Sequence, residues 1–153
     1  KLIEYAAFYG SIQIIRYLQY NQVELTPSLW IYAIHSNNAE LIHFLEENNV
    51  NPPNNDYEIC LKEAIKCHHN DIADYIIINI MDEKDINFNV ENNFSDNIYH
   101  YCFKYHNYHF LPNRSYSKFS FLYLCKYNYI TFVELYYKYK GADINLTIDQ
   151  KSI

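Results

Sequence analysis

Glycine is nearly absent from this sequence, which contains only Gly10 and Gly141 among its 153 residues. Phosphate-binding loops need several closely spaced glycines, so no such loop is present. The sequence also lacks a G-x-S-x-G segment, the strained turn that exposes the nucleophilic serine of many hydrolases. The adjacent carboxylates Glu46 and Glu47 are followed by two asparagines, which is typical of the solvated end of a helix. We therefore expect a protein that is not an enzyme and that needs no cofactor.

Closely spaced cysteines and long apolar runs are missing as well. The four cysteines include no C-x-x-C pair, and because half of the residues are hydrophobic, the chain can bury a core without disulfides. We expect free thiols in a reducing compartment, and hence an intracellular, cytoplasmic protein. No apolar run approaches the ~20 residues that span a bilayer, so we expect no membrane partner. The chain begins at Lys1 instead of Met, which we interpret as a fragment of a longer chain.

Tyrosine and asparagine are abundant where glycine is scarce, with 18 and 19 residues respectively. The net charge of −6 is unevenly distributed. Residues 1–100 contain five basic and fifteen acidic residues, a charge of −10, whereas residues 101–153 contain seven and three, a charge of +4. An acidic chain repels the phosphates of nucleic acids, so we expect no nucleic-acid partner for the chain as a whole.

A short pattern recurs along the chain. Each copy has a small or apolar pair, two variable residues, and then a residue that tolerates a left-handed backbone. A polar residue follows, and apolar residues at positions i, i+1 and i+4 then predict a second helix. Neither helix is apolar on all sides, so we expect each helix pair to bury its apolar face against the next pair. The copies are Ala6–Leu18, Ala33–Leu45, Ala64–Ile76 and Leu124–Tyr136.

This pattern resembles the helix pair of the ankyrin repeat, which reads roughly A-A-x-x-G-H-x-E-I-V-x-x-L-L. His69 falls on the family's histidine, whose ring hydrogen-bonds backbone at the helix junction, and Asp71 falls on its glutamate. The segment 141–145 matches the G-A-D-x-N sequence with which ankyrin repeats end. The T-P-L-H opening of a strong repeat is absent. The chain looks similar to the divergent ankyrin-related repeats of large protist protein families.

The resemblance implies an all-α fold, an α-solenoid of stacked helix-turn-helix repeats that forms a single domain over residues 1–153. Because T-P-L-H is missing, we expect irregular loops in place of regular hairpin fingers between the pairs. The predicted helix pairs cover residues 2–20, 28–48, 57–80 and 119–140, and an irregular helix and loop cover residues 94–112.

The resemblance also implies a protein–protein interaction module, or scaffold, whose partner the sequence does not identify. In ankyrin-like stacks the binding groove is lined by the two variable residues before the left-handed position. Here these residues vary between aromatic, imidazole, hydroxyl and cationic side chains, as expected where packing does not dictate the residue. The predicted partner-binding face consists of Phe8, Tyr9, His35, Lys66, Lys126 and Tyr127.

Three alternatives remain open. The chain can be a capping or spacer segment of a longer array, with no binding of its own. Its basic, tyrosine-rich C-terminal third can bind nucleic acid by stacking bases on rings, although the helical spacing favours buried rings. The sequence also contains histidines and cysteines at helical spacing, and these are the usual ligands of zinc. Because the compact C-x2-C knuckle of many zinc sites is missing, we favour side chains that are packed or exposed to solvent, and we expect no bound metal. These ligand candidates are His100, Cys102, His106 and His109, with Cys67, His68 and His69 as possible additions.

Overall fold

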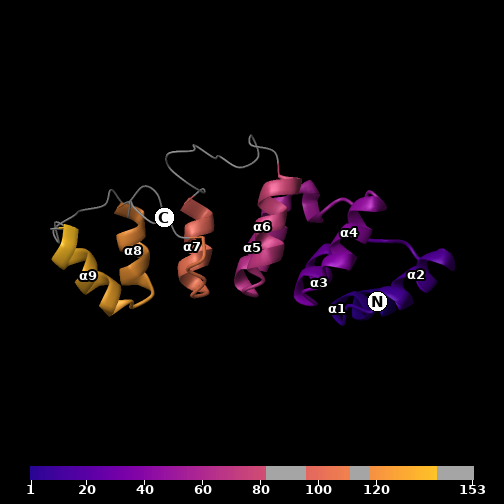
Figure 1. Cartoon of the computed structure of the whole chain (residues 1–153), viewed down its shortest axis with the longest axis horizontal. Coiled ribbons are helices and arrows are strands. Elements are labelled where there is room, and N and C mark those ends of the chain that lie inside the picture. Colours follow the sequence, from indigo (N-terminus) through magenta and orange to yellow (C-terminus); the bar gives the residue numbers. More distant parts are fainter. Residues whose placement is uncertain (82–95, 111–117, 141–153) are drawn as a thin grey trace. The chain divides into compact units, whose positions relative to one another are not determined.

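The structure is a computed structural model that describes residues 1–81, 96–110 and 118–140 (Figure 1). Within these ranges every regular element is a helix, which confirms the predicted all-α class for this part of the chain. None of the described helices is long and apolar enough to cross a membrane. Backbone contacts divide the chain into a first unit, residues 1–111, and a second unit, residues 112–153.

The described part of the first unit consists of helix pairs and a further helix that begins after residue 95. The predicted ranges 2–20, 28–48 and 57–80 each contain a pair of short helices. The pairs are α1 (Leu2–Phe8) with α2 (Ile12–Tyr20), α3 (Leu29–His35) with α4 (Ala39–Glu47), and α5 (Tyr57–Lys66) with α6 (Asn70–Tyr75). The helix α6 continues into the π-helical turn η2 (Ile76–Ile80), and the short 3-10 turn η1 (Pro53–Asn55) precedes α5. The further helix, α7, spans Asp96–Lys104.

The described part of the second unit is one helix pair, α8 (Lys118–Lys126) and α9 (Ile130–Lys140), which contact each other. These bounds fall close to the predicted range 119–140. Leu124 of α8 is buried at 1% exposure, so the small or apolar position of the sequence pattern faces the interior here too. The segment that matched the end of an ankyrin repeat, residues 141–145, lies outside the described residues.

Each first helix of a pair, α7 included, ends before a residue with a left-handed backbone. The amide of the third residue after the helix then bonds back into it: Ser11 N donates to Ala6 O at 2.7 Å and Asn107 N to Cys102 O at 2.9 Å. This arrangement satisfies carbonyls that a helix end otherwise leaves unpaired. The left-handed residues are Gly10 (φ 66), Asn37 (φ 51), His68 (φ 60) and His106 (φ 58) in the first unit, and Asn128 (φ 58) in the second.

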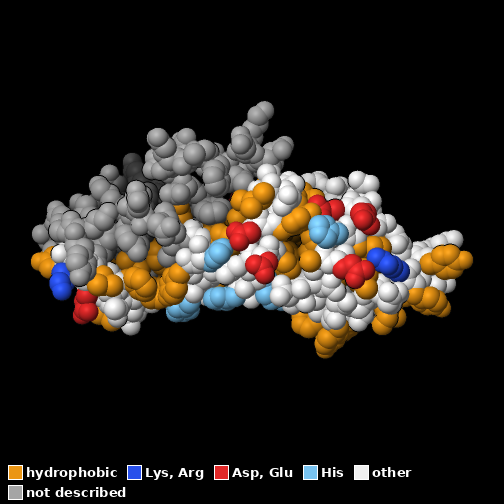
Figure 2. All heavy atoms as spheres, viewed as in Figure 1, with side chains coloured by type: hydrophobic (Ala, Val, Ile, Leu, Met, Phe, Trp, Pro, Cys, Tyr) orange, Lys and Arg blue, Asp and Glu red, His pale blue; other side chains and the backbone are white. Residues whose placement is uncertain are grey.

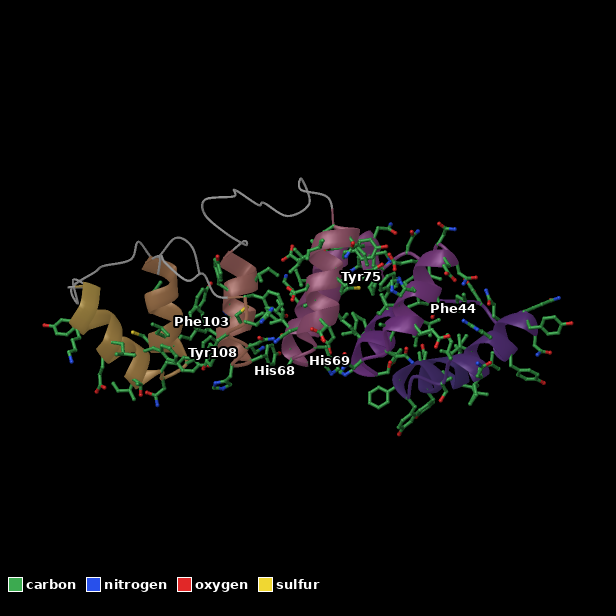
Figure 3. The ribbon with its side chains drawn as sticks, in the orientation of Figure 1. Phe44, His68, His69, Tyr75, Phe103 and Tyr108 are labelled. Carbon is green, nitrogen blue, oxygen red and sulfur yellow. The ribbon has the colours of Figure 1, made fainter. Side chains whose placement is uncertain are left out.

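At three turns of the first unit, the residue after the left-handed position connects its helix pair, or α7, to the preceding pair. Asn38 Nδ2 donates to the Gly10 carbonyl at 3.0 Å. Asn107 Nδ2 donates to the Ile65 carbonyl at 2.9 Å, and Asn107 is only 2% exposed. His69, at the turn after α5 (Figure 3), has Nδ1 2.7 Å from the Ile34 carbonyl, which confirms the expected backbone bond of this histidine.

The core of the first unit lies between successive helix pairs, because α1 contacts α3, α3 contacts α5, and α5 contacts α7. The indole of Trp30 is fully buried there, and its Nε1 donates to the Val50 carbonyl at 2.7 Å. All four cysteines carry free thiols. Other fully buried core residues are Ala7, Ile15, Leu29, Ala33, Ile34, Leu41, Leu45, Cys60, Ala64, Ile65, Ala73, Ile76 and Cys102.

Candidate functional site

The first helices of the first unit carry a set of side chains at equivalent positions outside the core. Residues five, two and one positions before the left-handed residue lie on one side of a helix, because neighbours three and four apart share a face. We name this set the first-helix face. Its members are Tyr5, Phe8 and Tyr9 of the first pair, Tyr32, His35 and Ser36 of the second, Glu63, Lys66 and Cys67 of the third, and Tyr101, Lys104 and Tyr105 at α7.

The structure brings three of the predicted binding residues into one aromatic group. Phe8 and Tyr9 are 42% and 74% exposed, and their rings meet edge to face with centroids 5.2 Å apart. The Phe8 ring also lies 5.6 Å from the imidazole of His35. This contact joins the end of α1 to the end of α3, so the face is continuous from the first pair to the second.

Lys66, the fourth predicted residue of the first unit, is linked to His35 by the carboxylate of Glu63, which contacts both side chains. Glu63 Oε1 lies 2.7 Å from His35 Nε2 and 2.9 Å from Lys66 Nζ. The Cys67 sulfur lies 3.5 Å from the other ring nitrogen of His35, Nδ1. The second and third pairs are therefore linked by a small polar cluster at the centre of the first-helix face.

The electrostatics of this cluster favour a charged Lys66 and a neutral Cys67. The hydrogen bond to Glu63 raises the pKa of Lys66, so this side chain stays protonated. Burial, and then the charge of Glu63, raises the pKa of the Cys67 thiol. A thiol with a raised pKa is a poor nucleophile at neutral pH, so the cluster lacks the activated cysteine that covalent catalysis needs.

The first-helix face continues onto α7, in a segment that the sequence predicted to be irregular. The rings of Tyr101 and Tyr105 lie 5.6 Å apart, and Lys104 Nζ lies 5.0 Å from the Tyr105 ring centroid. Lys62 of α5 lies 5.5 Å from the Tyr101 ring. His68 Nε2 is 2.8 Å from the Tyr105 carbonyl, which fixes the end of α7 against the turn after α5 (Figure 3).

A hollow of about 330 Å³ opens on the first-helix face at its α1 end. Figure 2 shows hydrophobic side chains that project below α1, and histidines along the same edge over α5 and α7. This volume can accept a single side chain of a partner protein. The hollow is lined by Lys1, Glu4, Tyr5, Phe8, Tyr9 and Tyr32.

The remaining two predicted residues, Lys126 and Tyr127, belong to the second unit. They occupy the two positions before the left-handed Asn128, and Lys126 Nζ lies 5.7 Å from the Tyr127 ring centroid. Lys126 is exposed and Tyr127 is half-buried. The structure therefore places these two residues beside each other, and places the other four predicted residues together on the first unit.

Sequence reasoning missed several members of the first-helix face. Glu63 precedes Lys66 and Cys67 by three and four positions, and this helical spacing was a usable signal. The position five residues before the left-handed residue holds a tyrosine in every copy except the third, where Glu63 stands. Because these tyrosines recur at helical spacing, the sequence pattern indicated core residues at their positions. The tyrosines concerned are Tyr5, Tyr32 and Tyr101 of the first unit and Tyr123 of the second.

The zinc candidates named from the sequence do not gather in the structure. Cys102 is fully buried, and burial raises its pKa to about 12. His109 Nε2 lies 3.0 Å from a carboxylate oxygen of Asp74 instead. Within the described ranges, the residues close enough together to share a metal ion are His35, Glu63 and Cys67.

No family model matches this sequence, and neither the curated proteins nor the solved structures include a significant match. The function proposed below is therefore based on the residues and geometry of this chain.

Proposed function

We propose that this chain is a protein–protein interaction module without catalytic activity, and that its first-helix face binds the partner. The observation that carries this proposal is the exposure of aromatic rings on the first-helix face beside buried alanines of the same helix. Tyr5 of α1 and Tyr9, the residue that follows α1, are 67% and 74% exposed, whereas Ala6 and Ala7 of α1 are 6% and 0% exposed. Exposing rings while burying alanines is unfavourable for a helix whose only role is packing.

Tyrosine, phenylalanine and histidine rings suit a protein-binding surface. A tyrosine side chain offers a large contact area with few rotatable bonds, and its hydroxyl can bond a polar group of the partner. Binding hot spots are accordingly enriched in tyrosine. The hollow beside Tyr5, Phe8 and Tyr32 gives such a surface the concave shape that anchors a partner side chain.

We further propose that the helix pairs of the first unit stack in chain order as an ankyrin-like solenoid. The contacts of α1 with α3, α3 with α5 and α5 with α7 support this arrangement. Second helices are also linked from pair to pair, since Arg16 bonds Glu40 at 3.1 Å and the Tyr75 hydroxyl bonds Glu46 at 2.9 Å. In such a stack each pair buries the apolar surface of its neighbour.

A capture experiment with matched variants tests the binding function. Replacing Phe8, Tyr9 and His35 together with alanine removes the aromatic group of the first-helix face and leaves the buried core unchanged. A partner captured from a lysate by the wild-type chain is expected to bind this variant about 30-fold more weakly, since a hot-spot loss is about 2 kcal/mol or more. The control variant replaces Tyr17 and Tyr20 of α2, which are 67% and 87% exposed.

The control should retain the partner with wild-type affinity, measured by calorimetry on the purified complex. Equal loss of binding in both variants would assign the effect to exposed aromatics in general. Equal retention in both would place the binding surface elsewhere. A wild-type chain that captures no specific partner would support the capping or spacer role and contradict the proposal.

A further inference from the structure

We propose that His35 and Cys67 form a binding site for a thiophilic divalent metal ion such as Zn²⁺, with Glu63 as the residue that orients the histidine. This site is a second activity of the chain and does not depend on the proposed partner. His35 ends α3, Cys67 follows α5, and α3 contacts α5. A bound ion therefore links the second helix pair to the third.

The two ligand atoms already stand at the spacing that zinc requires. Zinc binds a histidine nitrogen at about 2.0–2.1 Å and a cysteine sulfur at about 2.3 Å, so tetrahedral geometry separates the two atoms by about 3.5 Å. Cys67 Sγ lies 3.5 Å from His35 Nδ1. An ion can thus enter between them without a change of helix position.

Glu63 favours the tautomer of His35 that carries its proton on Nε2 and leaves Nδ1 free of a proton. Its Oε1 lies 2.7 Å from His35 Nε2, where it accepts a hydrogen bond from the Nε2–H group. The lone pair of Nδ1 then faces the sulfur of Cys67 and is available to a metal ion. Carboxylates that hold the second nitrogen of a ligating histidine in this way orient the ring and increase its basicity.

A bound metal ion takes the place of the thiol proton of Cys67. Without metal, the Cys67 thiol lies close enough to donate a hydrogen bond to His35 Nδ1. When the ion binds, this proton leaves to solvent and metal–sulfur and metal–nitrogen bonds form. The remaining coordination positions are filled by water or by a side chain of another molecule.

The donor set selects the kind of ion. A thiolate with an imidazole favours zinc and similar borderline or soft ions, whereas magnesium and calcium require oxygen ligands. The His35 and Glu63 side chains are 31% and 16% exposed, so the cluster is fixed by its surroundings and still open to solvent. The nearest cation, Lys66, is held by Glu63 at 2.9 and 3.2 Å.

Cobalt titration of the purified, reduced chain tests the site, because a cobalt–thiolate bond gives a charge-transfer band in the near ultraviolet. We expect the band in the wild type and its loss in Cys67→Ser. His35→Ala should lose most of the affinity. Glu63→Gln should keep the band but need about tenfold more cobalt, as expected for a residue that orients a ligand. The matched control is Cys125→Ser, which removes an exposed cysteine of the second unit and should keep the band.

A second measurement uses the wild-type chain alone and avoids any effect of a variant on folding. Zinc should slow the alkylation of Cys67, followed by mass spectrometry of its peptide, and leave the rate at Cys125 unchanged. An unchanged rate at Cys67 in excess zinc, or a cobalt band that persists in Cys67→Ser, would overturn the proposal. Neither result would bear on the capture experiment, because no partner is present.

Discussion

Replacing Trp30 with alanine is expected to lower the free energy of unfolding by about 3–5 kcal/mol. Trp30 is fully buried, and its ring packs edge to face on Tyr57 with centroids 5.3 Å apart. The contact joins α3 to α5, so the cavity left by the substitution opens between two helix pairs. Domains of this size are stable by only about 5–15 kcal/mol, so a large part of the stability is lost. Urea unfolding followed by circular dichroism measures the change.

The variant Trp30→Phe separates packing from hydrogen bonding at the same place. It keeps an aromatic ring but removes the Nε1 donor that bonds the Val50 carbonyl at 2.7 Å. Loss of this buried bond is expected to cost about 1–3 kcal/mol. If both Trp30 variants unfold at the wild-type urea concentration, the indole is not in the core and the described packing is wrong.

Enlarging the small residues between helix pairs is expected to have the second-largest effect. Ala33 and Ala64 are fully buried on α3 and α5, which contact each other. Ala33→Leu or Ala64→Leu forces the packed helices apart and should cost about 1–3 kcal/mol through overpacking. Thermal melts followed by circular dichroism measure this cost.

The matched control for this prediction is Ala39→Leu. Ala39 begins α4 and is exposed, so the same added volume extends into solvent. We expect its stability to stay within about 0.5 kcal/mol of the wild type. A control that is destabilised as much as Ala33→Leu would show that the buried alanines do not set the helix spacing.

The helix pairs of the first unit were predictable because their signals are local. A residue that tolerates the left-handed backbone, such as Gly10 or Asn37, marks the turn, and buried alanines such as Ala33 mark the close contact. The sequence predicted a helix in the α7 segment but not its equivalence to the other copies, because Cys102 and Phe103 occupy the positions of the small or apolar pair. These two residues are buried as the alanines of the other copies are, at 0% and 1% exposure. Their larger side-chain volume, and not their polarity, therefore made the copy at α7 hard to recognise in the sequence.

The candidate site was only partly predictable. Phe8, Tyr9 and His35 could be named because the residues before the left-handed position change from copy to copy. The contribution of Glu63 depends on a contact between α3 and α5, and sequence spacing alone does not say which helices meet. Cys67 stood among the variable residues, but its distance from His35 Nδ1 is a property of the packed pairs.

The central claim is that neighbouring helix pairs pack in chain order, and nuclear Overhauser contacts between aromatic side chains test it most directly. We expect cross-peaks between the rings of Phe8 and His35, and between Trp30 and Tyr57, whose ring centroids lie 5.6 and 5.3 Å apart. These pairs connect α1 to α3 and α3 to α5. Cross-peaks that join α1 directly to α5, with none for these two ring pairs, would contradict the claim.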